Sequence, residues 1–522
     1  MTALDSSRPA TADERDPASS PPAGAGLKAD SLGYVSNLVI AVASTAPAYS
    51  LAATLGFVVA VAGVGVHAPA VLIVAFVPIL FVSLAYRYFN IADPDAGTAF
   101  AWVTRTFGPQ LGWINGWAMF LAGIIVMASL AEVASSYTFT LLGLNSLAHS
   151  NLALILGCLV WIGLMTWICY RGIEVSARVQ LGLLAFEIVM LAVFTVVALL
   201  KVYASHPTHS IRVRAEWFNP FDLSFKALSA GVLLGVFIYW GWDAGVAVNE
   251  ESRDRHHAPG RAAVLSTVIL LLTYVSVSVA AQAFHGPGFL SGNSSDVLNA
   301  LGGSVFGSPL DKLLTLAVLT SAAASTQTAV LETSRTTFSM ARWKALPSAF
   351  GQIHPRFLTP RFGTLFMGAL SMIWTVALLA FNPDQSVLGD TISALGFAVV
   401  FYYGLTGLAC AVYFRRDLLK SPRNLLLAGI VPLTGGAMMA FVGVKAYSYY
   451  DTAGNNYSTP LGGIQTPILV GVGGLILGVV LMLACWPFLP DYFRRRPEHA
   501  NPEVLAHASA AGSASDPGGL AR

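Results

Sequence analysis

An acidic residue lies in the middle of an otherwise apolar stretch of the chain. Asp243 is flanked by two tryptophans and two glycines in the sequence GVFIYWGWDAGVAVNEES, which begins at Gly235. Glycine loosens a helix and frees its backbone groups, and a tryptophan ring attracts a cation placed over its face. A carboxylate, free peptide groups and aromatic rings in one short segment are typical of a site that binds a small charged molecule.

A second apolar segment, AVASTAPAYSLAATLG, is interrupted in the same way. It carries Pro47 in its middle, close to Ser44, Thr45 and Ser50. Proline removes an amide donor and clashes with the preceding turn, so a helix can open there. In lipid, the freed amides and carbonyls can bind only the groups that face them. Because glycine and proline are common in membrane helices, the prediction of a binding site rests on the two interruptions together.

The composition indicates what kind of elements position these residues. Of the 522 residues, 55% are hydrophobic and only 11% are charged, whereas soluble domains average about a quarter charged residues. The chain is therefore predicted to be an all-α polytopic membrane protein. Segments long enough to cross a bilayer, about 20 apolar residues, are expected at 34–61, 68–92, 109–143, 151–170, 178–202, 226–251, 262–284, 307–334, 362–381, 387–413, 424–447 and 466–488.

The positive charges support twelve spans with both termini in the cytoplasm. With that topology, the outer loops contain only Lys201, Arg212, Arg214, Lys226, Lys312 and Lys445. The inner loops and the C-terminal side contain Arg87, Arg105, Arg171, Arg178, Arg253, Arg255, Arg261, Arg335, Arg342, Lys344, Arg356, Arg361, Arg415, Arg416, Lys420, Arg423, Arg494, Arg495 and Arg496. One span more or fewer would reverse every later loop and destroy this asymmetry.

Several classes of protein do not fit the sequence. Residues 1–30 and 491–522 are predicted to be disordered cytoplasmic tails, and the first of them lacks the features of a signal peptide. The net charge of +2 is too small to suggest nucleic-acid binding. HExxH, GxSxG and Walker A motifs are absent, so neither an enzyme nor an ATP-driven pump is expected. The cysteines lie in apolar runs without CxxC spacing and are interpreted as packing residues rather than metal ligands, at Cys158, Cys169, Cys410 and Cys485.

Four motifs resemble those of the amino acid–polyamine–organocation permeases, over about 31–450. They are AGTAFAWVTRTFGPQLGWINGW (96–117), YRGIEVSARVQ (170–180), IYWGWDAGVAVNEES (238–252) and the most specific match, TSRTTFSMARWKALPSAFGQIHPRFLTP (333–360). The resemblance implies a LeuT-type fold with interrupted helices 1 and 6. Its two inverted five-helix repeats would be residues 31–205 and 225–414, followed by two further helices in 422–490. Many members have a Gly-Ser-Gly break in helix 1, whereas this chain has STAPAYS, and this departure leaves the substrate open.

The resemblance also implies where a substrate would bind. A substrate carboxylate would be held by backbone amides at the break in helix 1, at Ser44, Thr45, Ala46, Pro47 and Ala48. The substrate amino group would face carbonyls at the break in helix 6, around Tyr239, Trp240 and Gly241. Trp240 or Trp242 would cover the ligand, or simply pack between helices. Asp243 would contact an amine, take part in proton movement or cap the second half-helix.

Other polar residues are expected to serve coupling and gating. Glu187 lies alone in the apolar run LLAFEIVMLAVF, where several relatives have a lysine, and it could carry the coupling proton or remain a buried protonated carboxyl. Glu132 is expected to be a packing residue. Ser325 and Thr326 offer hydroxyls for sodium instead, although such residues often join membrane helices. Gate-side ion pairs are expected among Glu250, Glu251, Arg253 and Arg255.

The resulting prediction is a secondary carrier in the cytoplasmic (inner) membrane that imports an amino acid or related amine with protons. Sodium is the alternative coupling ion, and no other cofactor is expected. A polyamine or organic-amine carrier, or an amino acid exchanger of the same fold, is the main alternative. A transport-like amine sensor would usually carry an added signalling domain. Either a monomer or a homodimer is compatible with the sequence.

Overall fold

The computed structural model describes residues 26–381, 387–452 and 463–497. In these residues the secondary structure consists of helices joined by loops, without any β-strand. Most of the two predicted tails, 1–25 and 498–522, therefore lies outside the described residues. The α-helices are α1 (Tyr34–Ser44), α2 (Pro47–Ala60), α3 (Ala68–Ala92), α4 (Ala99–Phe107), α5 (Pro109–Leu141), α6 (Asn145–Ala148), α7 (Asn151–Tyr170), α8 (Ile173–Ala204), α9 (Phe225–Ile238), α10 (Ala244–Ala247), α11 (Ala258–Gly292), α12 (Val297–Phe306), α13 (Asp311–Arg342), α14 (Arg361–Phe381), α15 (Val387–Tyr413), α16 (Pro422–Asn424), α17 (Val431–Tyr450), α18 (Thr466–Cys485) and α19 (Pro490–Phe493).

Eleven helical segments of the described chain are long and apolar enough to cross a membrane, and these segments establish a polytopic membrane protein. They coincide with the predicted spans except for the sixth. The predicted span 226–251 consists of α9, which has 14 residues, and the four-residue α10 beyond it. A bilayer crossing needs about 20 helical residues, so α9 alone is too short. The short α9 agrees with the interruption that the sequence predicts within this span.

The first interruption divides α1 from α2 within the segment Tyr34–Ala60. Ala46 between them has a φ of 46°, in the left-handed region that non-glycine residues rarely adopt. Pro47 then occupies the first position of α2. Its fixed φ suits the start of a helix and its missing N–H would be unpaired there anyway. The proline thus starts the second half-helix at the position where the first cannot continue.

The second interruption separates α9 from α10. Gly241 has a φ of 114°, which is readily adopted by glycine because it lacks a Cβ atom. The chain passes through the break with α9 ending at Ile238 and α10 starting at Ala244. Both interruptions expected from the sequence are therefore present in the backbone.

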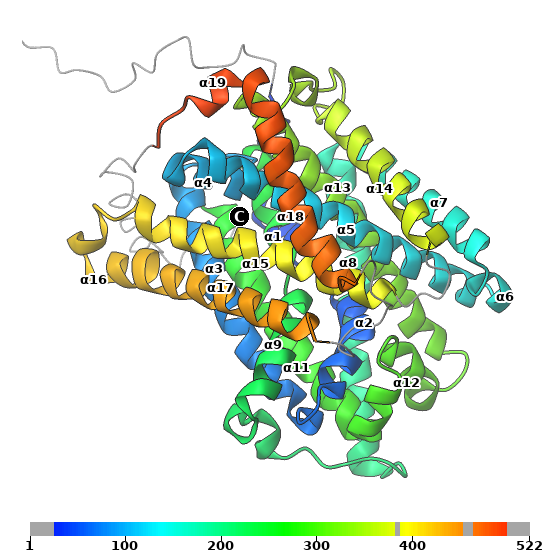
Figure 1. Cartoon of the computed structure of the whole chain (residues 1–522). Helices are drawn as coiled ribbons and strands as arrows, with labels where there is room; N and C mark the ends of the chain where they lie inside the picture. The colour runs from blue at the N-terminus through cyan, green and yellow to red at the C-terminus, as the bar shows by residue number, and fades with distance from the viewer. Residues whose placement is uncertain (1–25, 382–386, 453–462, 498–522) are drawn as a thin grey trace, which may run out of the picture.

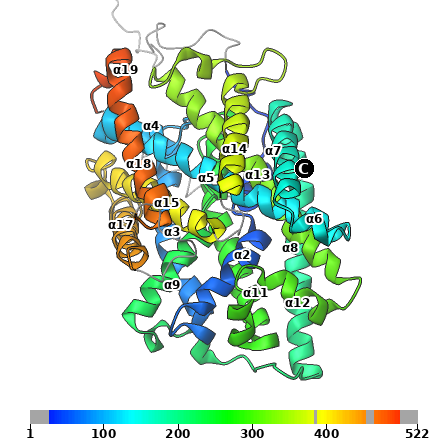
Figure 2. The same cartoon turned by 45° about the vertical axis from the view of Figure 1, so that its right-hand side comes forward.

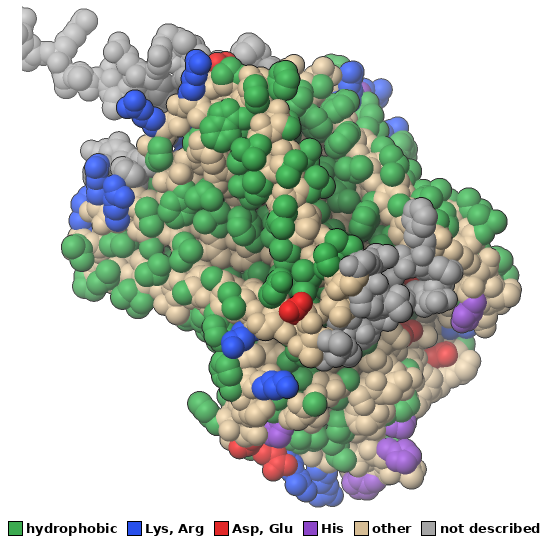
Figure 3. Space-filling view, in the orientation of Figure 1, with side chains coloured by type: hydrophobic (Ala, Val, Ile, Leu, Met, Phe, Trp, Pro, Cys, Tyr) green, Lys and Arg blue, Asp and Glu red, His purple; other side chains and the backbone are tan. Residues whose placement is uncertain are grey.

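Burial separates central helices from peripheral ones. In the most apolar 18-residue stretch of Tyr34–Ala60, 94% of the stretch is buried inside the protein, whereas the corresponding share for Thr466–Phe488 is 22%. Figures 1 and 2 place α17 and α18 on the outside of the bundle. The face in Figure 3 shows a broad band of hydrophobic side chains across them, as lipid contact requires. Helices α4 and α19 lie at one end of the bundle, and α12 lies at the opposite end. The end with α4 and α19 is the one that the sequence predicts to face the cytoplasm, and it is called the inner end below.

Candidate functional site

The two interruptions contact each other in the centre of the protein. The hydroxyl of Ser44, at the end of α1, donates to the carbonyl of Gly241 and to that of Ala41. The carbonyl of Ser44 accepts a hydrogen bond of 2.8 Å from the hydroxyl of Ser325 on α13. A Cβ atom at Gly241 would lie only 2.7 Å from the Ser44 carbonyl oxygen. Glycine at this position therefore permits the two broken helices to approach closely.

The start of α2 is capped by an acid from another helix. The amide of Ala48 donates to Oε1 of Glu187 on α8 at 2.6 Å, and the hydroxyl of Ser321 donates to the same oxygen at 2.7 Å. The amide of Tyr49 donates to the Ser321 hydroxyl at 3.1 Å. Glu187 is fully buried, and its Oε2 has no partner among the described residues. The Ala48 amide, predicted to face a substrate carboxylate, is thus bonded to Glu187 in this structure.

The remaining predicted polar groups of the first break bond locally. The amides of Thr45 and Ala46 donate to carbonyls one turn back in α1, and the Thr45 hydroxyl donates to the carbonyl of Val42 at 2.7 Å. Ser50 donates to the carbonyl of Thr45 at 2.7 Å. Thr326, considered for sodium, donates within its own helix. The bonds of Thr45, Ala46 and Ser50 thus occupy backbone groups within the break itself.

The carboxylate of Asp243 is surrounded by tyrosine hydroxyls from two other helices. Tyr86 of α3 and Tyr402 of α15 donate to Oδ2, at 3.3 and 3.0 Å. Tyr403 donates to Oδ1 at 2.8 Å. Asp243 is fully buried. Three tyrosine hydroxyl groups from two other helices thus converge on the acid that the sequence singled out.

Sequence reasoning missed the three tyrosine partners of Asp243. These tyrosines lie in apolar runs where they look like packing residues. Which acid meets which partner depends on helix packing.

The tryptophans of the second break have different surroundings. Nε1 of Trp240 donates to the hydroxyl of Tyr402 at 2.5 Å, so a chain of hydrogen bonds leads from the indole through this tyrosine to Asp243. Trp242 is fully buried and packs edge-on to Tyr86 and against the ring of Tyr403, with centroids 4.9 and 5.2 Å apart. Trp242 therefore packs between helices in this conformation, whereas Trp240 is slightly exposed.

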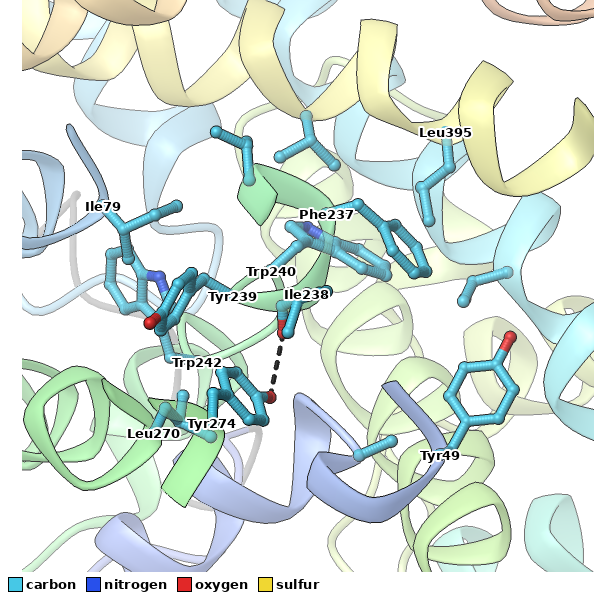
Figure 4. Close-up of a cluster of buried hydrophobic side chains, with 14 of the residues drawn as sticks. Tyr49, Ile79, Phe237, Ile238, Tyr239, Trp240, Trp242, Leu270, Tyr274 and Leu395 are labelled. Carbon is cyan, nitrogen blue, oxygen red and sulfur yellow. Dashed lines mark hydrogen bonds between the residues drawn. The ribbon is translucent and has the colours of Figure 1, made fainter. Parts of the chain in front are cut away.

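Figure 4 shows the aromatic groups around the second break, with Tyr49 of α2 at the lower right. The ring of Tyr239 packs edge-on to that of Tyr274 with centroids 5.1 Å apart. The hydroxyl of Tyr274 donates to the carbonyl of Ile238, the last residue of α9, at 2.9 Å. A carbonyl at the end of a half-helix is left unpaired by the helix itself, and Tyr274 satisfies it.

Ion pairs close the inner end of the bundle next to the second break. Arg335 of α13 forms two hydrogen bonds of 2.6 and 2.8 Å with Glu251, and both side chains are at most 2% exposed. Arg342 bonds to Glu250 at 2.5 and 2.7 Å and also contacts Asp95. Burial alone would raise the pKa of Asp95, but Arg342 and hydrogen bonds from neighbouring side chains hold this pKa below its usual value.

These partners differ from the predicted ones. Glu250 and Glu251 do form ion pairs, but Arg253 and Arg255 are exposed to solvent, and Nε of Arg253 donates to the carbonyl of Asp30. Arg335 and Arg342 are seven residues apart and therefore share one face of α13. This face reaches the two glutamates more readily than the arginines that follow them closely in sequence. The sequence could not show that this face of α13 meets η4 (Asn249–Glu251).

The family model described as amino acid permease matches residues 32–464, most of the chain. The chain belongs to this family. The permease is 27% identical to the Asc-type amino acid transporter 1 of Mus musculus over 438 residues, covering 80% of this chain and 73% of the relative. It is 25% identical to the branched-chain amino acid permease BcaP of Lactococcus lactis over 349 residues, covering 62% and 71%.

These similarities confirm the resemblance drawn from the four sequence motifs. The family and the relatives are permeases and transporters, so this permease is not an enzyme. The matched region also contains both interruptions, the tyrosine-bound Asp243 and the ion pairs of the inner end.

Proposed function

We propose that this permease is a secondary active carrier that moves an amino acid across the cytoplasmic membrane by alternating access. The observation that carries the proposal is the direct contact between the interrupted helices, through Ser44 and Gly241, inside the protein. Half-helix ends at such breaks offer partial charges of both signs to a zwitterion. Membership of the amino acid permease family supports an amino acid as that zwitterion.

The proposal includes twelve spans, with α9 and α10 together forming the sixth. Helices α1 to α8 would form the first five-span repeat, α9 to α15 the second, inverted one, and α16 to α18 the two additional spans. In this scheme the two interrupted helices are the corresponding first members of the repeats, as transporters of this type arrange them. The arginine-rich inner end would face the cytoplasm, with both termini on that side.

The substrate would lie along the two breaks. Its carboxylate would face the positive N-terminal end of α2, where Glu187 and the peptide groups of Ala46 and Ala48 lie. Its ammonium group would face the carbonyls between Tyr239 and Gly241, with Trp240 covering it through a cation–π contact. Because Glu187 occupies the Ala48 amide in the structure, substrate binding would compete with Glu187 for this end of α2.

A carrier for cationic amines is the second candidate. It is favoured by Asp243, a fully buried acid at the break whose printed partners in the described part of the chain are tyrosine hydroxyls rather than a basic group. A relative named for branched-chain amino acids favours a neutral zwitterion instead. Exchange of two substrates is compatible with either cargo.

Substrate counterflow in proteoliposomes separates these candidates. Proteoliposomes containing the purified full-length permease would be loaded with one unlabelled compound at a time. Uptake of the labelled form of the same compound would then be measured without any ion gradient. Neutral branched-chain and small amino acids are expected to support counterflow, whereas lysine and putrescine are not. Binding can be checked independently by the rise in melting temperature, because a ligand specific for the native state stabilises it. A binder without counterflow would indicate a sensor.

Proton coupling is proposed at Glu187. Replacing Glu187 with glutamine keeps an oxygen that can accept both hydrogen bonds to Oε1 but prevents the exchange of a proton. We expect the variant to lose uptake driven by a pH gradient while keeping counterflow. Uptake and counterflow measured in the same proteoliposomes test this expectation.

The control for this variant is Ser325→Ala, because Ser325 was considered for sodium and bonds to Ser44. If sodium couples transport, that variant loses sodium-driven uptake and Glu187→Gln does not. Unchanged pH-driven accumulation by Glu187→Gln would refute the assignment of the coupling proton to Glu187.

A further inference from the structure

The segment that follows α18 is bound to the inner end of the bundle, beside α4 (Figures 1 and 2). Tyr492 of α19 is fully buried. Its hydroxyl donates to the carbonyl of Pro109, the first residue of α5, at 2.9 Å and lies 3.0 Å from the hydroxyl of Thr104 on α4. Its ring stacks on that of Phe100, also on α4, with centroids 6.0 Å apart. A buried tyrosine whose hydroxyl has partners fixes the position of a segment, so Tyr492 anchors this one to α4 and α5.

Three residues beyond this anchor, the same segment reaches the end of α13. The guanidinium of Arg495 lies over the ring of Trp343, 4.9 Å from its centroid. The guanidinium of Arg105, from α4, lies over the same ring at 4.8 Å. Both positions are favourable, because an aromatic face attracts a cation. The segment therefore contacts α4 through Tyr492 and the end of α13 through Arg495.

Trp343 is also part of the network that closes the inner end. Its Nε1 donates to Oδ2 of Asp95, in the loop between α3 and α4, at 3.0 Å. Asp95 also accepts from the hydroxyl of Ser339 at 2.5 Å and from Arg342 at 3.4 Å. Arg342 in turn bonds to Glu250, which follows the second break. The ring covered by the C-terminal segment thus belongs to the same network as the ion pairs.

The network and the C-terminal segment join the same parts of the protein. Asp95 is buried and joins the loop before α4 to the end of α13. Arg495 is exposed, and together with Tyr492 it joins α4 to the end of α13 along the surface. Separation of α13 from α4 would have to break both sets of contacts. Contacts that exist only in the closed arrangement shift the equilibrium toward it by their own free energy.

We infer that the C-terminal segment, residues 490–495, is part of the inner gate and holds Trp343 in the position that keeps this gate closed. This inference rests on the proposed carrier function, because alternating access requires the inner end to open. Tyr492 and Arg495 are positioning residues, which act through Trp343 on Asp95 rather than on the substrate. Their loss is expected to raise the population of the arrangement that is open on the inner side.

The test is the concentration dependence of transport from each side of the membrane. Right-side-out and inside-out membrane vesicles from cells producing the full-length permease would take up a labelled amino acid that supports counterflow. Arg495→Ala removes one cation–π contact at an exposed residue, which corresponds to about a two- to fivefold change in the equilibrium. Because a substrate on the inner side binds only the open fraction, KM from that side should fall by this factor. KM from the outer side should stay equal or rise.

Variants of the anchor extend the test. Tyr492→Ala removes the stacking on Phe100 and both hydroxyl contacts, so KM from the inner side should fall at least as far as in Arg495→Ala. Tyr492→Phe keeps the ring and should give a smaller fall than Tyr492→Ala. If Tyr492→Ala fails to fold, the exposed Arg495 still decides the outcome.

Phe488→Ala is the matched control. Phe488 is an aromatic residue four positions before Tyr492, and it is 82% exposed. Its replacement should leave KM unchanged on both sides, and a fall equal to that of Arg495→Ala would contradict the inference. A purely structural role of the segment would lower the maximal rate on both sides and leave KM unchanged. A wild-type KM from the inner side in Arg495→Ala therefore overturns the inference, whether or not the maximal rate falls.

Failure of the inference and failure of the proposed function are distinguishable. If wild-type protein shows no counterflow with any amino acid, the carrier proposal fails. If wild-type counterflow is present but Arg495→Ala keeps the wild-type KM from the inner side, the permease is a carrier whose inner gate closes without the C-terminal segment.

Discussion

Replacing Arg335 with methionine is expected to lower the free energy of unfolding by about 3–5 kcal/mol, because the variant leaves the charge of Glu251 buried and unpaired. Glu251 is fully buried, and Arg335 is the partner to which it is bonded through both oxygens. Water cannot replace the guanidinium at this position without opening the inner end. Chemical denaturation of the purified protein in mild detergent, followed by tryptophan fluorescence, measures the loss.

Two further variants test the cause of this effect. The double variant Arg335→Met with Glu251→Leu removes both charges, and it should recover most of the lost stability, since burying an apolar pair carries no charge penalty. Lys28→Met breaks the ion pair with Glu174, whose side chains are 42% and 45% exposed, so its cost should stay within about 1 kcal/mol. Equal losses in the single and double Arg335 variants would show that packing rather than charge determines the result.

Replacing Gly241 with alanine is expected to reduce substrate counterflow strongly. The added Cβ would lie 2.7 Å from the carbonyl oxygen and 3.0 Å from the carbonyl carbon of Ser44. Because these are backbone atoms, one of the two breaks must move, and the φ of 114° is also unfavourable for alanine. A strain of about 1–3 kcal/mol corresponds to a fall of about 5–150-fold in the population of the native arrangement.

Gly396→Ala is the matched control for this prediction. Gly396 also lies in a membrane-spanning helix, α15, but its added Cβ would meet no atom within 4 Å. Alanine is a better helix former than glycine by about 1 kcal/mol, so this variant should keep its counterflow, and its melting temperature should stay the same or rise. If both variants retain wild-type counterflow, close contact between the two breaks is not required for transport.

Several features were predictable because they depend on local chemistry. A chain with 11% charged residues cannot cover itself with a water-facing surface, so the class of membrane protein followed from composition. Pro47 and Gly241 interrupt their helices through their own backbone preferences, and both interruptions are present at the expected positions. The family motifs were equally local, and the match over residues 32–464 confirmed them.

The predictions that involved partners were less successful. Glu250 and Glu251 were expected to pair with arginines a few residues away, but α13 supplies the arginines. The amide of Ala48 was expected to face a substrate, but Glu187 reaches it from α8. Nothing in the sequence near Asp243 indicated the tyrosines of α3 and α15 that surround it.

The sequence by itself therefore determined the membrane class, the family and the places where two helices break. Only the tertiary structure decided which charges pair and which side chains surround the breaks, including the tyrosines around Asp243. The physical reason is the range of the forces involved. Backbone geometry and hydrophobicity act within one segment, whereas ion pairs and hydrogen bonds depend on which helix faces meet when the bundle packs.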